Sequence, residues 1–261
     1  MFTRGQMRSR STTGNGQTAD QSKRRFALVA AFGLLFMAVL APFAQFGVLQ
    51  TLIVPADAAA TTANLLASAG IFRAAIAAFL IIATLDIVVA WGLYILLRPT
   101  NASLALLVAW LRVAYAAVFA YALVNLLDVA QLLQNTSATA LSPVQVQAQV
   151  ASSIASFNNG WDLALAIFGL HLVGLGALLF KAVDFPKVLG ALVAVAGVGY
   201  LADSFGTILV PDYTLTISVF TFIGEALLIA WLFKLAIRGS NPSDSPRVIG
   251  SSALATEAVG S

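Results

Sequence analysis

The chain of 261 residues contains no cysteine, a single histidine and few charged residues. Without cysteine there can be no disulfide, no thiolate metal site and no cysteine nucleophile. The lone histidine, His171, has no second histidine with which to build a zinc site, so we expect neither a metal nor a cofactor. Charged residues make up 10% of the chain, against roughly 25% in soluble domains. This shortage of charge excludes an ordinary soluble globular protein.

Apolar residues, by contrast, make up 60% of the chain. Several apolar runs reach the roughly 20 residues that a transmembrane helix needs. The sequence therefore predicts an all-α integral membrane protein, a six-helix transmembrane bundle. The predicted spans are Phe26–Val48, Ile71–Leu97, Ala102–Leu127, Leu163–Phe180, Val188–Val210 and Leu215–Phe233.

Polar segments flank this membrane domain, which we assign to residues 26–237. Residues 1–25 are rich in Ser, Thr, Gly, Gln and Arg, and residues 238–261 are also polar, so a disordered basic arm and a disordered tail are expected. A basic segment before an apolar run is also typical of a signal peptide. However, the run from Phe26 exceeds the roughly 7 to 15 residues of a signal core, which favours an uncleaved first span.

The two longer loops between spans are predicted to carry short surface helices. In the first, Pro55 breaks the preceding helix and Asp57 can cap a new one over Ala58–Ala67. In the second, Ser142-Pro143 is a helix start and Asn159-Gly160 is a stop. Apolar residues follow that start at helical spacing, namely Val146, Val150, Ile154 and Phe157.

Basic residues are concentrated on one side of the predicted bundle. Of fourteen, only Arg73 and Arg112 fall inside spans, and the other twelve all lie on the side of the two termini. By the positive-inside rule both termini of this multi-pass protein are expected to be cytoplasmic. A basic arm beside a span is explained by topology and anionic lipid. The expected partner is therefore the bilayer rather than nucleic acid.

Four ionisable residues are predicted to share one depth near the middle of the membrane. Asp86 lies fourteen residues before Thr100 and Arg112 lies twelve after it, so in an antiparallel hairpin their levels differ by only about 3 Å. An unpaired charge at this depth costs at least about 2.5 kcal/mol, which favours a pair. His171 and Glu225 also fall near mid-depth. We name Asp86, Arg112, His171 and Glu225 the central polar layer.

A second, outer polar layer is predicted from Arg73 and Asp203, which fall together nearer the opposite surface. Two interpretations of both layers stay open. The residues can form a site for a small molecule or a proton, or they can be structural pairs that fix the register of the helices.

Several short motifs resemble a bacterial membrane family catalogued as domain of unknown function 4386. The likeness covers about Phe26 to Ile237 and is carried by Pro55-Ala56-Asp57 through Asn64, Phe72-Arg73, Arg98-Pro99, Arg112, Gly169-Leu170-His171-Leu172, Phe185-Pro186-Lys187, Gly199-Tyr200-Leu201 and Glu225. The resemblance implies a multi-spanning bacterial inner-membrane protein. It also places Asp57 and Asn64, the surface-helix motif, at motif positions together with Arg73, Arg112, His171 and Glu225. It implies no activity, because the family is uncharacterised.

Three classes of function follow. The favoured interpretation is small-ligand binding or transport at the central polar layer. A non-catalytic assembly or sensing protein would use the charged pairs only to specify its fold. An intramembrane enzyme acting on a lipid would use His171 and Glu225 as acid and base, although no nucleophile accompanies them. The sequence leaves the oligomeric state open.

The predicted topology is tested by labelling. A cysteine introduced by Ser137→Cys, in a loop predicted to face outward, should react with a membrane-impermeant thiol reagent applied to intact cells. The chain has no other cysteine to confuse the result. Labelling that appears only after cell lysis would contradict the orientation.

Overall fold

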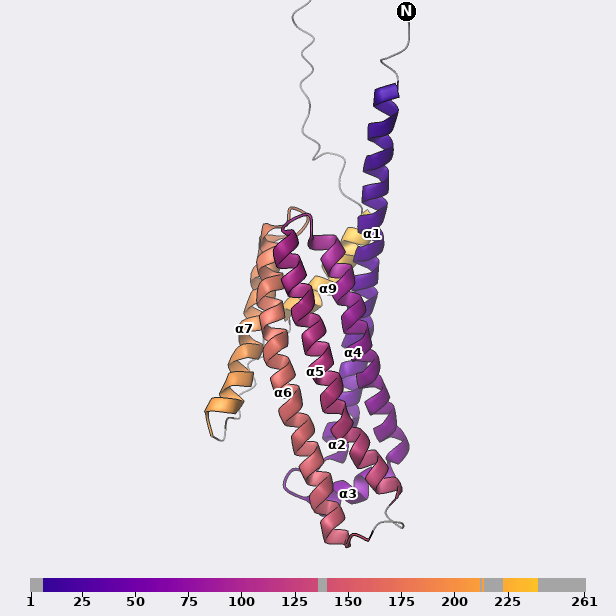
Figure 1. Cartoon of the computed structure of the whole chain (residues 1–261), viewed down its shortest axis with the longest axis vertical. Helices are drawn as coiled ribbons and strands as arrows, with labels where there is room; N and C mark the ends of the chain where they lie inside the picture. Colours follow the sequence, from indigo (N-terminus) through magenta and orange to yellow (C-terminus); the bar gives the residue numbers. More distant parts are fainter. Residues whose placement is uncertain (1–6, 136–139, 212, 214–222, 239–261) are drawn as a thin grey trace, which may run out of the picture.

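The computed structural model describes residues 7–135, 140–211, 213 and 223–238, and in this part of the chain every regular element is a helix (Figure 1). The elements are α1 (Met7–Pro42), the π-helix η1 (Phe43–Leu49), α2 (Gln50–Leu52), α3 (Ala58–Ala67), α4 (Ala69–Leu97), α5 (Ala102–Gln134), α6 (Pro143–Lys181), α7 (Lys187–Leu209) and α9 (Ile223–Arg238).

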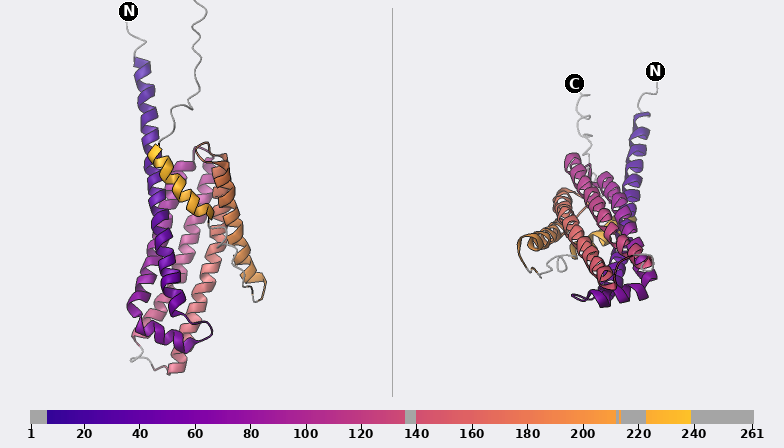
Figure 2. Two further views of the ribbon diagram at one scale, coloured as in Figure 1. Left: turned by 180° about the vertical axis from the view of Figure 1, so that it is seen from behind. Right: turned by 60° about the horizontal axis from the view of Figure 1, so that its bottom comes forward.

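The long helices pack largely in chain order. α4 lies against α1, α5 against α4, α6 against α5, and α7 against α6. α9 contacts both α1 and α7, and Figure 2 shows it running obliquely across the bundle. The turns after α4 and α6 lie at one end, which we call the Arg98 end, and α3 lies at the opposite end (Figure 1). α9 thus closes the circle of helices in the described part.

Among the described residues, five helices are long and apolar enough to cross a membrane, which agrees with an all-helical, multi-pass membrane protein. They cover Gln21–Leu52, Ala69–Leu97, Ala102–Gln134, Pro143–Lys181 and Lys187–Leu209. The sixth predicted span, Leu215–Phe233, begins in residues 214–222, which lie outside the described residues. Its remainder belongs to α9, which has 16 residues. The predicted tail after Arg238 also lies outside the described part.

The first helix differs from the sequence prediction at both ends. Its backbone is helical from Met7, within the arm predicted to be disordered. Once the apolar run from Phe26 is helical, extending that helix needs no new nucleation. At the other end, Pro42 removes a backbone donor and its ring clashes with the preceding turn. The backbone widens there into the π-helix Phe43–Leu49, which continues directly into α2.

α4 and α5 form the hairpin that sets the depth of the central charges. α4 ends at Leu97, and Asn101 caps α5 because its side-chain oxygen accepts from Leu104 N at 3.0 Å. Asp86 lies eleven residues before Leu97, and Arg112 lies ten residues after Ala102. Since each residue adds about 1.5 Å, the short turn brings the two to one level.

The second predicted surface helix is wrong as a separate element. Ser142 begins a helix through a reciprocal capping box with Gln145, as expected. However, Asn159-Gly160 does not end it, and α6 runs unbroken for 39 residues. Gly160 lies against Ala122 of α5, where an added Cβ would come within 2.8 Å of the alanine methyl. The glycine therefore permits a close helix crossing and is not a stop.

Glycines also set the distance between α6 and α7. A Cβ on Gly176 would lie 2.5 Å from the carbonyl oxygen of Gly190 and 2.6 Å from Ala194 N. A Cβ on Gly169 would lie 2.8 Å from the carbonyl oxygen of Gly197. Small residues let helix backbones approach closely, which is a main source of attraction between helices in a bilayer. The glycines are therefore required for α7 to pack directly against the backbone of α6.

This packing predicts opposite effects for two glycine substitutions. Gly176→Ala should destabilise the detergent-solubilised protein by about 1–3 kcal/mol, because the new methyl meets rigid backbone. Gly70→Ala, the control, should leave stability unchanged or raised, since nothing lies within 4 Å of a Cβ there and alanine favours a helix. Thermal unfolding measures both. Equal melting temperatures for the two variants would contradict the packing account.

Candidate functional site

Asp86 and Arg112 meet inside the bundle. Nη2 of Arg112 lies 2.7 Å from Oδ1 of Asp86, and the two side chains are 2% and 0% exposed. Neither carboxylate oxygen accepts a hydrogen bond of good geometry. The contact is therefore a close ion pair and not a bidentate hydrogen-bonded pair. The pair joins α4 to α5 at one depth and neutralises two charges that would each be costly alone.

His171 of α6 completes a buried triad with this pair. Nη1 of Arg112 lies 3.2 Å from Nε2 of His171, and Nδ1 of His171 lies 2.8 Å from the carbonyl oxygen of Val108. A guanidinium only donates, so Nε2 must accept. A carbonyl only accepts, so Nδ1 must carry the hydrogen. The contacts therefore define a neutral imidazole with its proton on Nδ1.

An aromatic wall encloses the guanidinium. The Phe168 ring centroid lies 5.5 Å from Cζ of Arg112, and the same ring stacks on His171 at 5.7 Å. Tyr115 and Tyr200 pack against Phe168 at 4.8 and 5.4 Å. The cation thus meets a ring face as well as its ionic partner. Sequence reasoning missed this wall, although Phe168 lies three residues before His171 and Tyr115 three after Arg112, each on the same helix face.

Glu225 approaches the layer from a different direction, in the first turn of α9. A Cβ on the preceding Gly224 would lie 2.7 Å from the carbonyl oxygen of Leu192, so glycine allows α9 to lie close to α7. The carboxyl of Glu225 faces the hydroxyl of Tyr200 and is within electrostatic range of Arg112 and Asp86. The structure therefore gathers all four residues of the central polar layer, from four helices.

Four buried polar atoms of this layer have no hydrogen-bond partner among the described residues. They are Oδ1 and Oδ2 of Asp86, Nε of Arg112 and Oε1 of Glu225, and of these Oδ1 is engaged in the ion pair with Arg112. Buried polar atoms in proteins are nearly always partnered. The unused atoms therefore mark where the layer has hydrogen-bonding capacity left for a further species.

The outer polar residues have separate partners. Nη2 of Arg73 donates to the carbonyl oxygen of Ala130 at 3.2 Å. Asp203 accepts a hydrogen bond from the hydroxyl of Tyr213 at 2.9 Å. Arg73 is carried by α4 and Asp203 by α7, so each ties its own helix to a neighbouring segment.

The surface-helix motif has local contacts. Asp57 caps α3, since Ala60 N donates to its carboxylate at 2.8 Å. Nδ2 of Asn64 donates to the carbonyl oxygen of Leu52 at 3.2 Å, which holds α3 against the end of α2. Ala56, directly before Asp57, has a φ of 60° in a turn in which Asp57 N donates to the carbonyl oxygen of Val54 at 3.2 Å. These residues shape the entry into α4.

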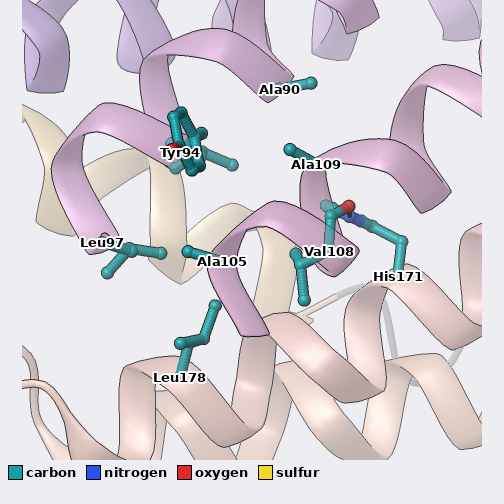
Figure 3. Close-up of a pocket in the computed structure, with 9 residues that line it drawn as sticks. Ala90, Tyr94, Leu97, Ala105, Val108, Ala109, His171 and Leu178 are labelled. Atoms are coloured by element: carbon teal, nitrogen blue, oxygen red, sulfur yellow. Dashed lines mark hydrogen bonds between the residues drawn. The ribbon is translucent and has the colours of Figure 1, made fainter. Parts of the chain in front are cut away.

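A small cavity of about 10 Å³ lies between α4, α5 and α6, on the Arg98 side of His171 (Figure 3). Tyr94 and His171 supply its polar side chains, and the remainder of its lining is apolar. A second cavity, of about 40 Å³, lies beside Arg73 and Gln134. The first has room for about one water molecule. Both are far below the roughly 300 Å³ at which pockets for larger organic ligands begin.

Comparison with known proteins places the chain in a family. A family described as "Domain of unknown function (DUF4386)" matches residues 29–235. The chain belongs to this family, which confirms the resemblance seen in the sequence. An uncharacterized protein of Archaeoglobus fulgidus is 34% identical over 154 residues, which cover 59% of this chain and 78% of that protein. No solved structure matches. The family match includes every residue of both polar layers.

The triad predicts non-additive stability. Asp86→Asn and Arg112→Gln should each destabilise the detergent-solubilised protein by about 3–5 kcal/mol, because each leaves a buried charge unpaired. The double variant should recover part of the summed loss. Thermal unfolding supplies the measurement.

Asp184→Asn is the matched control, since the Lys23–Asp184 pair is about 30% exposed and such pairs contribute about 0–1 kcal/mol. Losses that simply add in the double variant would show that Asp86 and Arg112 act independently.

Proposed function

We propose that the protein binds or transports a small ligand at the central polar layer, within the membrane. The observation that carries this proposal is Oε1 of Glu225, which is buried and has no partner in the described part of the chain. An unpartnered carboxyl oxygen in a hydrocarbon environment is costly. A polar ligand bound at this oxygen would supply the missing partner and offset that cost.

The four residues divide into two kinds of surroundings. Asp86, Arg112 and His171 are buried, whereas Glu225 as a whole residue is half-buried. A ligand would therefore reach the layer from the side of α9. This arrangement assigns the triad the task of positioning and Glu225 the task of contact with the ligand.

The assembly or sensing alternative draws support from the triad itself. Arg112 has Asp86 on one amino group and His171 on the other. Such a closed, neutral set specifies the register of α4, α5 and α6 without any ligand. A protein that used the layer only for its fold would need nothing more, but it would leave Oε1 of Glu225 buried without a partner among the described residues.

The contacts of His171 count against the enzyme alternative. Its Nε2 already accepts from Arg112, and its Nδ1 already donates to Val108. An acid or base must release or take a proton at a nitrogen that faces the substrate. Here the accepting nitrogen faces a cation, so protonating it would set two positive charges against each other.

Water access to Glu225 tests the proposal. In membrane vesicles, Glu225→Cys should react with a small hydrophilic thiol reagent, because a ligand site must be open to water in one of its states and thiols react as thiolates. Leu228→Cys, one turn away at a residue 2% exposed, is the matched negative control. Val183→Cys, at a residue 95% exposed, is the positive control. A Glu225→Cys variant as unreactive as Leu228→Cys would overturn ligand binding in favour of a closed structural layer.

A further inference from the structure

The central polar layer contains two carboxyl groups and one positive charge. Arg112 forms its ion pair with Asp86, and the hydrogen bonds of His171 require a neutral ring. Glu225 is therefore left as the second acid without a cation of its own. With both acids ionised, the layer would carry a net negative charge inside the membrane, which is energetically costly.

We infer that Glu225 binds one exchangeable proton, so that the ligand of the central polar layer is a proton. The inference rests on the proposed function, because it names the ligand of the same site. The proton comes from water and bonds to a carboxylate oxygen, which converts the layer from one net negative charge to none. Oε1 has no competing partner in the described part of the chain, so it is free to hold this hydrogen.

Among the described residues, the groups around Glu225 supply no positive charge other than that of Arg112. Those within electrostatic range are Arg112, Asp86, Tyr200 and Tyr115. α1 also packs against α9, but its basic residues lie at the Arg98 end, where Arg24 donates to the carbonyl oxygen of Ile237. Ile237 is twelve residues from Glu225, or about 18 Å along the helix. Of the basic side chains in the described part, Arg112 is thus the one that acts on this carboxyl.

A proton fits this site better than a metal ion. Hard cations require about six oxygen ligands, whereas the layer offers two carboxyl groups and the Tyr200 hydroxyl. Among the described residues, no group of three or more His, Cys, Asp and Glu side chains could hold a metal ion. A proton needs one carboxyl oxygen.

The proton is also coupled to the ion pair. When Glu225 loses it, the new carboxylate attracts Arg112, the cation that Asp86 already holds. Nε of Arg112 has no partner and is available for a second contact. The ionised carboxyl thus competes with Asp86 for the Arg112 guanidinium, whereas protonation of Glu225 removes this competition.

Infrared spectroscopy of the full chain in lipid membranes tests the inference. A protonated carboxyl group has a carbonyl stretch that an ionised one lacks. In mildly acidic buffer the wild-type protein should show this band, and Glu225→Gln should lose it. Asp162→Asn, which removes another partly buried carboxyl within α6, should keep it. Glu225→Asp should shift the band without abolishing it, which covers the case in which Glu225→Gln does not fold. Transfer to D₂O should shift the wild-type band, because an exchangeable proton is replaced by deuterium.

Each remaining outcome contradicts the inference. A band that survives in Glu225→Gln places the proton elsewhere. A band that is lost in Glu225→Gln but never shifts in D₂O makes the proton a fixed part of the fold. The cysteine experiment separates this failure from failure of the proposed function. A reactive Glu225→Cys variant without a Glu225 band would indicate a ligand other than a proton, whereas an unreactive one would reject ligand binding itself.

Discussion

The guanidinium of Arg112 lies inside the bundle, and its contacts come from the helices on either side of α5: Asp86 on α4, and His171 with Phe168 on α6. A charge in hydrocarbon is tolerated when its partners stand at the same depth. This requirement fixes how far α4 and α6 can slide along α5. Apolar packing alone would allow other registers, because one aliphatic face resembles the next, whereas the triad fits one register.

The position of α6 then determines the rest of the bundle. One face presents His171 to Arg112, and another presents Gly169 and Gly176 to the backbone of α7. The same continuous helix therefore joins a charge contact to a contact between backbones. Through α7 it also places Tyr200 beside Glu225. The location of Glu225 thus depends on Arg112 through two helix interfaces, although the two residues belong to distant parts of the sequence.

Depth could be predicted from the sequence because helices rise regularly from a recognisable turn. Counting from Thr100 paired Asp86 with Arg112, and the same procedure put His171 near them. Local signals for the end of a helix are less reliable. Asn159-Gly160 is typical of a helix end, but in the structure Gly160 allows α5 to pack closely against α6, and this depends on a helix from another part of the sequence. The hydrogen bonds of His171, and hence its neutral state, depend on the partner helix and could not be read from one chain segment.

The contacts of α9 suggest why its acid differs from the other buried acid. Toward its C-terminal end, Trp231 donates to the carbonyl oxygen of Asp184, which in turn pairs with Lys23 of α1. Leu228 and Leu232 of the same helix are buried. Glu225 lies before all of them, in the first turn of the helix. Within its described residues, α9 is therefore anchored at the Arg98 end, and Glu225 lies near the end farthest from this anchor. Asp86, by contrast, lies in the middle of the long helix α4. Of the two buried acids, Glu225 is therefore the better placed to exchange the proton that we propose.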